Sequence, residues 1–591
     1  MRKARREFLL STAAGLGAAA VSTACAQLAG AEVPASAPAP EPDLSPATFA
    51  EAQKLLQVEL SPAECAQAAR SWQANMAGIY ERRTGPRKVA LKAGVAPYST
   101  WNPVLPGQSS GPAVARFVRS TSDPGPLPAH DADIAFAPVT RLARWIERRA
   151  LSSERLTRIY LKRLETYTES LRCVITLTPQ LALAQARRAD AEIAAGQYRG
   201  ALHGIPWGAK DLLDTQGIPT TYGAEMFRDR LPASDAAVVQ RLDQAGAVLV
   251  AKLSLGALAL NDVWFGGQTM NPWLIEEGSS GSSAGPGAAT AAGLVGFSIG
   301  SETGGSIVSP SMRCGITGLR PTYGRVARSG AMTLCWSLDK LGPMTRSVED
   351  SMLVLNAIHG ADAADLQSVN RPLSFDAQSS VAGLRVGYIL KWMNEMPATD
   401  VDRAALDALR ALGLAPTEIT IPDWPYNTLN TILFAEGAAA FEELTLSGAA
   451  NRLRDQSDDA WPNTFRQARF LSAVDFVQAD RLRRRIAEEM ARVFSFVDCL
   501  LVPSMRDEIL SITNATGHPS LTMRAGYIDI SEARSDWLPS PNHPLLKLSP
   551  PRRVPHGITL IGRLFDEGLI ASVGLALERR LGIVDRRPPG Y

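Results

Sequence analysis

The sequence predicts an α/β fold, in which helices cover a mostly buried β-sheet, together with a small helical N-terminal extension. From about residue 130 onward, segments with the apolar spacing of helices alternate with short apolar runs typical of buried strands. The chain has 591 residues, 46% hydrophobic and 20% charged, which is ordinary for a globular protein with a large core. With 61 basic against 59 acidic residues, nothing in the charge favours nucleic acid or an anionic membrane as a partner.

The first 27 residues have the pattern of an export signal. Basic residues precede an apolar run that extends from about Phe8 to Val21. This run is shorter than the roughly 20 residues that a bilayer-spanning helix needs, so we expect no stable membrane span. Arg5-Arg6-Glu7-Phe8-Leu9 resembles the twin-arginine signal, whose cargo crosses the membrane already folded. We therefore expect residues 1–27 to be a twin-arginine signal peptide and the protein to reach a bacterial periplasm.

The end of this signal has two interpretations. Ala24-Cys25-Ala26 fits a small-x-small cleavage site just before Gln27. Alternatively, the four residues that end at Cys25 resemble a loose lipobox, which would make Cys25 a lipid-modified N-terminus and the protein a membrane-anchored lipoprotein. Ser22 stands where a lipobox usually has leucine, which favours simple cleavage.

Composition divides the rest of the chain into two parts. Residues 28–45 are rich in Ala, Pro and Glu, as in a flexible tether, and residues 46–85 have helical spacing. A second stretch rich in Pro, Gly and Ser, about residues 93–128, separates these helices from the remainder of the chain. We therefore predict a tether and helical extension over residues 28–128 and one large domain over residues 129–591.

Within the large domain, the elements can be predicted in order. Helical spacing is found around residues 156–164, 180–195 and 235–245, and strand-like apolar runs at residues 247–250, 295–299, 384–389 and 499–502. Residues 390–500 are more continuously helical. Residues 527–553 are polar and rich in proline, and we expect them to be an insertion.

Cysteine and histidine give no indication of a metal or cofactor. The sequence has six of each, without a C-x-x-C pair or an H-E-x-x-H motif, and the histidines never cluster at ligand spacing. If Cys25 is removed or lipidated, the five remaining cysteines are too few for a disulfide framework in a chain of this length. We therefore expect neither a metal nor a cofactor.

Residues 278–306 have the most unusual composition of the chain, GSSGSSAGPGAATAAGLVGFSIGSETGGS. A flexible linker would account for the glycines and serines, but not for the compact apolar segment Ala288–Ile299 between them. A nucleophile elbow is a second interpretation, because Gly281-Ser282-Ser283-Ala284-Gly285 matches G-x-S-x-G with Ser283 as the nucleophile.

The elbow has requirements that this sequence meets only in part. It needs a strand directly before the motif, and residues 271–277 make a poor buried strand. An acid and a histidine must come later in the chain, and Asp498 with His518 or His556 are available by order alone.

A third interpretation joins two serines of this segment to a distant lysine, Lys210. Apolar residues flank Lys210 on both sides, among them Trp207 and Leu212, so we expect its side chain to be buried. Burial disfavours the ammonium form and lowers the pKa of a lysine, which leaves a neutral amine that can act as a base.

Several long motifs occur in the order typical of the amidase signature family. They are HGIPWGAKDLLDTQGIPTTYGA, GSSAGPGAATAAGLVGFSIGSETGGSIVSP, CGITGLRPTYGRV, TNATGHPSLTMRAGY and HGITLIGRLFDEGLIASVGLALE. The resemblance covers roughly residues 130–591. It implies an α/β/α domain around a mixed sheet and an enzyme that hydrolyses linear carboxylic amides to an acid and an amine or ammonia. Its partner would be a small-molecule amide substrate.

The same resemblance assigns roles to individual residues. Ser306 would be the nucleophile that forms an acyl-enzyme, and Ser282, held by a cis peptide bond, and Lys210 would form the proton relay. Ser279 also follows a glycine and precedes a serine, but Ser282 fits the family without a gap and lies 306 − 282 = 24 residues before Ser306, the usual separation. The family's oxyanion hole maps onto Thr303, Gly304 and Gly305.

Two positions depart from the family pattern. Glu302 stands where the family often has Asp, and Val308 stands where it often has Arg. Glu302 keeps the charge, while Val308 removes a buried cation, so we expect different contacts around the turn. The rival functions are the glutaminase subunit of a tRNA amidotransferase, which an export signal opposes, and a noncatalytic binding protein, which the intact Lys210, Ser282 and Ser306 oppose.

Overall fold

The structure is a computed structural model that describes residues 44–591 except 57–58, 84–88, 90, 92–93, 96, 98–100, 109 and 538–543. The expected signal peptide over residues 1–27, with Cys25, and the tether up to residue 43 lie outside the described residues. The chain forms two compact units, which meet in sequence between Ala90 and Leu91. Residues 91–128, which the sequence grouped with the extension, are therefore counted with the larger unit.

The first unit is helical, as its apolar spacing predicts. It contains α2 (Pro46–Leu56) and α3 (Pro62–Arg83). Ser61 and Glu64 cap α3 reciprocally: Ser61 N–H donates to the Glu64 carboxylate at 2.8 Å, and Glu64 N–H donates to Ser61 Oγ at 3.3 Å. The Phe49 and Trp72 rings meet edge to face with centroids 5.4 Å apart, which joins the two helices.

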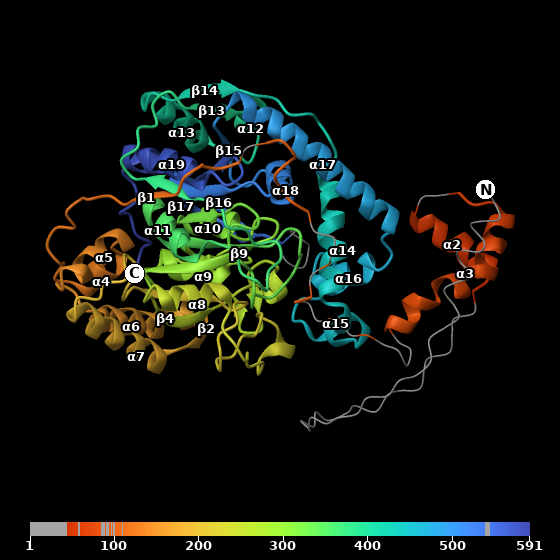
Figure 1. Cartoon of the computed structure of the whole chain (residues 1–591), viewed down its shortest axis with the longest axis horizontal. Coiled ribbons are helices and arrows are strands. Elements are labelled where there is room, and N and C mark those ends of the chain that lie inside the picture. The colour runs from red at the N-terminus through yellow and green to blue at the C-terminus, as the bar shows by residue number, and fades with distance from the viewer. Residues whose placement is uncertain are drawn as a thin grey trace. The chain divides into compact units, whose positions relative to one another are not determined.

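The second unit is built on an eleven-stranded mixed sheet (Figure 1). β3, β4 and β9 run parallel to one another near one end, and β13, β14 and β15 run parallel at the other, whereas the remaining pairs are antiparallel. In spatial order the strands are β14 (Ala415–Glu418), β13 (Arg385–Tyr388), β15 (Cys499–Pro503), β17 (Lys547–Gly562), β16 (Ser520–Glu532), β10 (Thr317–Arg320), β11 (Lys340–Thr345), β9 (Phe297–Glu302), β3 (Pro206–Lys210), β4 (Val248–Leu253) and β2 (Val174–Leu177).

Helices cover both faces of this sheet. Successive residues of a strand point to opposite faces, and β4 shows the consequence. Leu249 packs in one apolar cluster with Trp207 and Phe297, whereas Val248 and Val250 pack in another with residues of α6, α7 and α9. The α/β/α layering that the resemblance implies is therefore confirmed. The helices from residue 131 to 358 are α4 (Asp131–Phe136), α5 (Val139–Glu147), α6 (Ser153–Leu171), α7 (Pro179–Ala194), α8 (Ala237–Gln244), α9 (Ala284–Ala291), α10 (Val308–Cys314) and α11 (Val348–Ile358).

The region from 390 to 500 is largely helical, as expected, with β14 and the end of the sheet interleaved. Its helices, and those after it, are α12 (Leu390–Asn394), α13 (Asp400–Ala411), α14 (Asn430–Ala440), α15 (Glu442–Leu446), α16 (Trp461–Ala468), α17 (Ala473–Phe496), α18 (Asp507–Thr516) and α19 (Glu567–Leu581). Short 3₁₀ helices occupy Glu225–Phe227, Ala257–Ala259, Tyr426–Leu429 and Ala449–Arg452. Small two-stranded pairings join β1 (Arg116–Val118) to β12 (Ser374–Asp376), β5 (Val263–Trp264) to β6 (Gly267–Gln268), and β7 (Met270–Asn271) to β8 (Leu274–Gly278).

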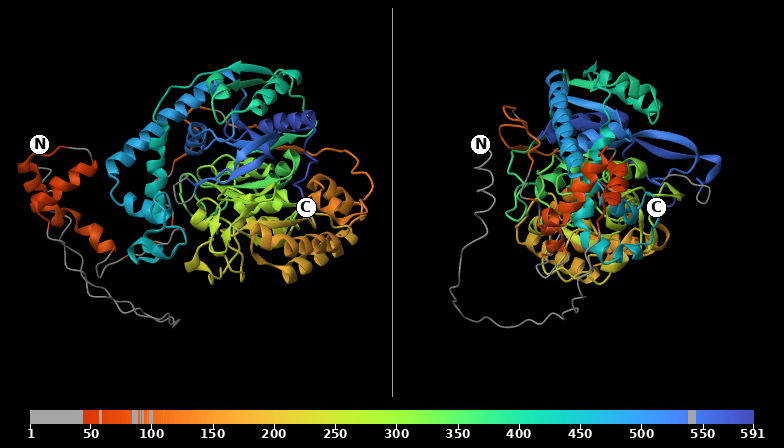
Figure 2. Two further views of the ribbon diagram at one scale, coloured as in Figure 1. Left: turned by 180° about the vertical axis from the view of Figure 1, so that it is seen from behind. Right: turned by 90° about the vertical axis from the view of Figure 1, so that its right-hand side faces the viewer.

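Residues 527–553, which we expect to be an insertion, include the ends of two paired strands. Residues 527–532 belong to β16 and residues 547–553 to β17, and the two strands pair from Ser520 opposite Ile561 to Glu532 opposite Lys547. The hairpin runs on well past the neighbouring strands and is drawn in blue in Figure 2. Pro550 and Pro551 lie in the outer part of β17. Among the described residues, β17 pairs only with β16 in this outer part. The other edge of β17 has no partner strand among them, so the missing N–H groups of the prolines can be tolerated there.

Among the described residues, no helix has the length and apolar character needed to cross a membrane. The five cysteines in that part of the chain are buried and form no disulfide. The same residues include no group of three or more His, Cys, Asp or Glu side chains placed to hold a metal ion.

Candidate active site

Lys210 ends β3 and is fully buried in the middle of the parallel part of the sheet. Its Nζ lies 2.8 Å from Ser282 Oγ, 3.0 Å from Ser283 Oγ and 2.9 Å from Ser301 Oγ. Burial lowers the pKa of Lys210 well below 10.5, although the charges of Asp339 and Glu302 oppose this shift. The side chain is thus surrounded by hydroxyl groups and is suited to be a neutral amine.

Ser282 lies in the turn between β8 and α9, after a cis Gly281–Ser282 peptide bond. Its side chain is 1% exposed, and Lys210 Nζ is its hydrogen-bond partner. Ser279, the competing choice of register, points elsewhere, because its Oγ donates to the Ser280 carbonyl at 3.1 Å. The structure therefore brings Ser282, and not Ser279, to Lys210.

Ser283 and Ser301 are partners of Lys210 that the sequence analysis did not identify. Ser283 Oγ also donates to the Ser301 carbonyl and accepts from the Ser301 N–H, both at 3.1 Å, so these two serines fix each other. The relevant sequence signal was the position of Ser301 near the carboxyl end of β9. β9 lies parallel to β3, so their carboxyl ends share one edge of the sheet.

Ser306 lies four residues after the end of β9 and is half-buried. Its carbonyl accepts a hydrogen bond from the Ser283 N–H at 3.1 Å, which ties the loop to the start of α9. Among the described residues, Ser306 Oγ makes no hydrogen bond with Ser282 Oγ. Catalytic hydrogen bonds often form fully only when substrate is bound, so this geometry is compatible with a relay between the two hydroxyls.

The loop from Thr303 to Ser306 presents free backbone donors. Gly305 has φ +132°, a backbone conformation that residues other than glycine rarely adopt. The N–H groups of Gly304, Gly305 and Ser306 donate to no other group in the described part of the chain. Thr303 is fixed, since its Oγ1 donates to Asp339 Oδ1 at 2.6 Å. Convergent free N–H groups beside a serine can stabilise a developing oxyanion.

The Glu302 carboxylate anchors the chain on the far side of Ser306. Its Oε2 accepts from the N–H groups of Ile307 and Val308 at 2.8 and 2.9 Å, and its Oε1 lies 2.6 Å from Arg320 Nη1 and 3.0 Å from Asn514 Nδ2. Burial favours a raised pKa, but Arg320 and the Val308 N–H outweigh it and hold the pKa of Glu302 below its ordinary value. Arg320 of β10 is thus the cation that pairs with Glu302.

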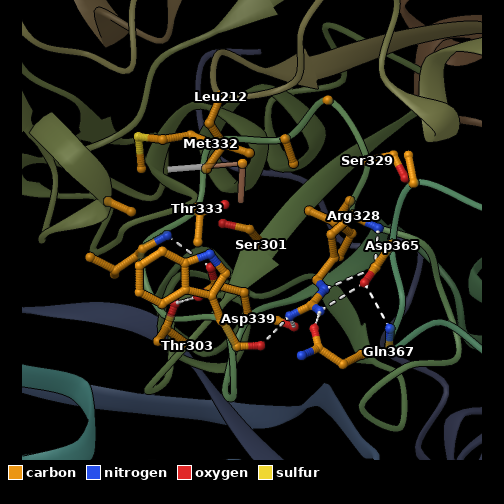
Figure 3. A pocket seen from close by; sticks show the side chains of 18 of the residues that line it. Leu212, Ser301, Thr303, Arg328, Ser329, Met332, Thr333, Asp339, Asp365 and Gln367 are labelled. Atoms are coloured by element: carbon orange, nitrogen blue, oxygen red, sulfur yellow. Dashed lines mark hydrogen bonds and ion pairs between the residues drawn. The ribbon is translucent and has the colours of Figure 1, made fainter. Parts of the chain in front are cut away.

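A cavity of about 400 Å³ opens beside these groups (Figure 3). Ser301, Thr303 and Asp339 connect it to the Lys210 cluster, while Ser306 is not part of its wall. Much of the remaining wall is apolar, formed by Leu212, Ala259, Met332, Leu334 and Leu341.

The cavity's cation is neutralised within the protein. Arg328 binds the Asp365 carboxylate through two nitrogens at 3.0 and 3.1 Å and donates to the Trp336 carbonyl at 2.6 Å. The cavity is therefore suited to an uncharged, largely apolar group.

The elbow interpretation finds no histidine at Ser283. β8 precedes the motif, but it pairs with β7 outside the central sheet and two of its five residues are exposed, so it is the poor buried strand that the sequence predicts. The candidate triad partners have other contacts: His518 with Thr516, His556 with Asp402, and Asp498 with Arg385.

Comparison with known proteins gives a consistent result. The Amidase family model matches residues 155–570. The chain is 35% identical over 483 residues to a Mycobacterium bovis protein named as an amidase, AmiD, which covers 78% of this chain and 99% of that protein. It is 32% identical over 470 residues to a glutamyl-tRNA(Gln) amidotransferase subunit of an Anaeromyxobacter species, covering 74% and 95%. The crystal structure of the peptide amidase from Stenotrophomonas maltophilia superposes with a TM-score of 0.64 at 27% identity, covering 77% and 98%.

The ion pair between Glu302 and Arg320 leads to a prediction about stability and activity. Glu302→Gln removes the charge opposite the fully buried Arg320. We expect the variant to lose about 3–5 kcal/mol of stability because an uncompensated buried cation remains. Hydrolysis of an amide substrate should also fall, since the two residues directly after Ser306 lose their charge-assisted anchor. The matched control is Glu276→Gln in β8, which is partly exposed and 4.0 Å from Arg552, and which we expect to stay within about 1 kcal/mol. Urea unfolding and kcat measure both effects, and equal stability of the two variants would contradict the proposed role of Glu302.

Proposed function

Because the chain belongs to the amidase signature family and is an amide-hydrolysing enzyme, we propose that it cleaves linear carboxylic amides through an acyl-enzyme on Ser306. The observation that carries this proposal is the fully buried Lys210 amine 2.8 Å from Ser282 Oγ. A buried amine without a carboxylate partner among its hydrogen bonds has the chemistry of a general base rather than that of a structural ion pair.

The proposed reaction has two halves. Neutral Lys210 accepts the Ser282 proton as Ser282 accepts the Ser306 proton, and Ser306 Oγ attacks the amide carbon. The backbone N–H groups of residues 303–306 then receive the oxyanion, each worth about 3–4 kcal/mol in the transition state. The relay returns the proton to the leaving nitrogen, so that amine or ammonia departs. Water repeats the sequence on the acyl-enzyme and releases the acid.

The cavity supports a substrate whose recognised part is neutral and largely apolar. Its wall is formed by side chains such as Leu212, Met332 and Leu341, and its cation Arg328 is already bound to Asp365. The rival activity, ammonia release from glutamine, requires recognition of a zwitterionic amino acid head. Arg328 is already paired with Asp365, so it is not free to bind the carboxylate of glutamine.

Amide hydrolysis by variants tests this function directly. The purified protein should hydrolyse neutral aryl or alkyl amides at least about tenfold more efficiently, in kcat/KM, than glutamine, which corresponds to about 1.4 kcal/mol of discrimination. Ser306→Ala should lose both hydrolysis and labelling by a fluorophosphonate probe, whereas Ser283→Ala should keep the label. Labelling of Ser306→Ala but not of Ser283→Ala would favour the elbow, and faster glutamine cleavage would favour the glutaminase.

The neutral lysine predicts a pH dependence. The pKa of Lys210 is lowered, so the free amine persists at pH values well below 10.5, where an ordinary lysine is protonated. As the pH falls through this lowered pKa, the base becomes an ammonium and kcat/KM should fall in proportion. Lys210→Ala should lose most of the activity at every pH. A wild-type profile that stays flat down to about pH 5 would be incompatible with a lysine base.

We also propose that the enzyme works outside the cytoplasm. The twin-arginine pattern at Arg5 and Arg6 supports export, and Cys25 offers the alternative of lipidation. In cell fractionation we expect the full-length chain in the periplasm. Replacement of both arginines, Arg5→Lys with Arg6→Lys, should retain it in the cytoplasm. Membrane association that disappears in Cys25→Ala would identify a lipoprotein, and unchanged export of the double variant would contradict the twin-arginine signal.

A further inference from the structure

The turn that carries Ser282 is held from outside by a short segment that comes after β16, residues 534–536. Asp536 Oδ2 accepts a hydrogen bond from the Gly281 N–H at 3.0 Å and another from Ser280 Oγ at 2.7 Å. Gly281 is the residue directly before Ser282. Asp536 therefore contacts the backbone of the proposed relay without contacting the relay's own side chains.

Two ion pairs fix the segment itself. Arg534 donates to the fully buried carboxylate of Glu277 from its backbone N–H at 2.9 Å and from Nη2 at 2.6 Å. Arg313 of α10 lies 3.0 Å from Asp536 Oδ1 and also donates to the Arg534 carbonyl at 3.0 Å. Arg313 thus holds the Asp536 carboxylate directly, and Glu277 anchors the same segment at Arg534.

The backbone of this turn adopts a conformation that needs support from neighbouring side chains. Ser280 adopts φ +64°, which is unusual for a residue other than glycine. Three side chains hold it there: Asp262 accepts from its N–H at 3.1 Å, Asp536 accepts from its hydroxyl, and Ser309 Oγ makes a short contact with the same hydroxyl.

The surroundings of the turn are equally tight. At Gly281 a Cβ would lie 1.7 Å from the Asn261 carbonyl, so no larger residue fits. Burial, together with the nearby Asp536 charge, raises the pKa of Asp262 to about 7. The two acids lie close together because both accept hydrogen bonds from Ser280.

We propose that Asp536 is a positioning residue for the Ser282 relay: it holds the Ser280–Gly281 turn so that Ser282 Oγ stays within reach of Lys210 Nζ. This rests on the proposed function of Ser282. A carboxylate suits the role because it accepts two hydrogen bonds from the turn on one oxygen and pairs with Arg313 through the other. An amide at the same place would offer one neutral acceptor and would weaken the contact with Arg313.

The expected effect is on the chemical step. Asp536 hydrogen-bonds to the turn and to Arg313 and lines none of the apolar cavity, so substrate binding should be preserved. A displacement of about 1 Å at a reacting group costs on the order of 10²-fold in rate. We therefore expect Asp536→Asn to lower kcat by about 10- to 100-fold with KM within about twofold of wild type. The rate of fluorophosphonate labelling at Ser306 should fall with kcat.

The matched control lies in the same hairpin. Glu532→Gln removes an acid that pairs with Lys547 at the surface at 2.7 Å, and it should leave kcat, KM and labelling unchanged. Rates are expressed per labelled active site, so that partial misfolding does not imitate a catalytic defect. Asp536→Glu, which keeps the charge, should recover part of kcat, and a purely structural role would give no such recovery.

The outcomes separate this proposal from the one it rests on. A kcat within about twofold of wild type in Asp536→Asn, with Ser306→Ala inactive, would overturn the positioning role alone. A rise in KM with unchanged kcat would also overturn it, because the residue would then act on binding. Activity retained in Ser306→Ala would instead overturn the proposed function.

Discussion

Burial of the Lys210 amine is the constraint on which the site depends. An isolated ammonium costs far too much free energy in an apolar interior, so a buried lysine is either paired with an acid or neutral. Lys252 shows the first solution one strand away: it is equally buried and lies 3.0 Å from Asp211. Lys210 lies within hydrogen-bond reach of three serine hydroxyls and of no carboxylate in the described chain. Two adjacent strands thus place the same residue type against different partners, an acid for Lys252 and hydroxyl groups for Lys210.

The order of the strands brings the other groups to this amine. β3 and β9 are parallel neighbours, so Lys210 and the loop after Glu302 leave the sheet at the same edge. α9 begins directly after Ser282-Ser283, and its first turn is tied to the loop by the Ser283 N–H. Ser282 and Ser283, which are 72 and 73 positions from Lys210 in the sequence, therefore lie within hydrogen-bond distance of its amine.

Local pattern accounts for much of the fold, and contacts between distant segments account for what it missed. The apolar residues around Lys210 predicted its burial, and the periodicities predicted strands such as β4, β13 and β15. The β7–β8 hairpin was not predicted. Its turn depends on the Asn271 side chain, whose Oδ1 accepts from the Trp273 N–H at 3.0 Å within a polar sequence.

The partners of the site residues were harder to foresee. The pairing of Glu302 with Arg320 could not be predicted from the local sequence, because Arg320 lies on β10, 18 residues further along the chain. Ser301 became a partner of Lys210 only through the pairing of β3 and β9.

The composition of the catalytic turns explains why charged side chains from elsewhere surround them. Glycine and serine let residues 278–306 approach other backbones closely, but they offer almost no apolar surface by which a turn could be held through packing. The shape must then come from hydrogen bonds, and those to charged groups are about twice as strong as neutral ones. Glu302 with Arg320 anchors the chain directly after Ser306, and Asp536 with Arg313 brackets the turn before Ser282. Both serines of the proposed relay are thus placed by buried ion pairs that take no part in the chemistry. The long β16–β17 hairpin serves the site because the residues directly after β16 return to one of these pairs.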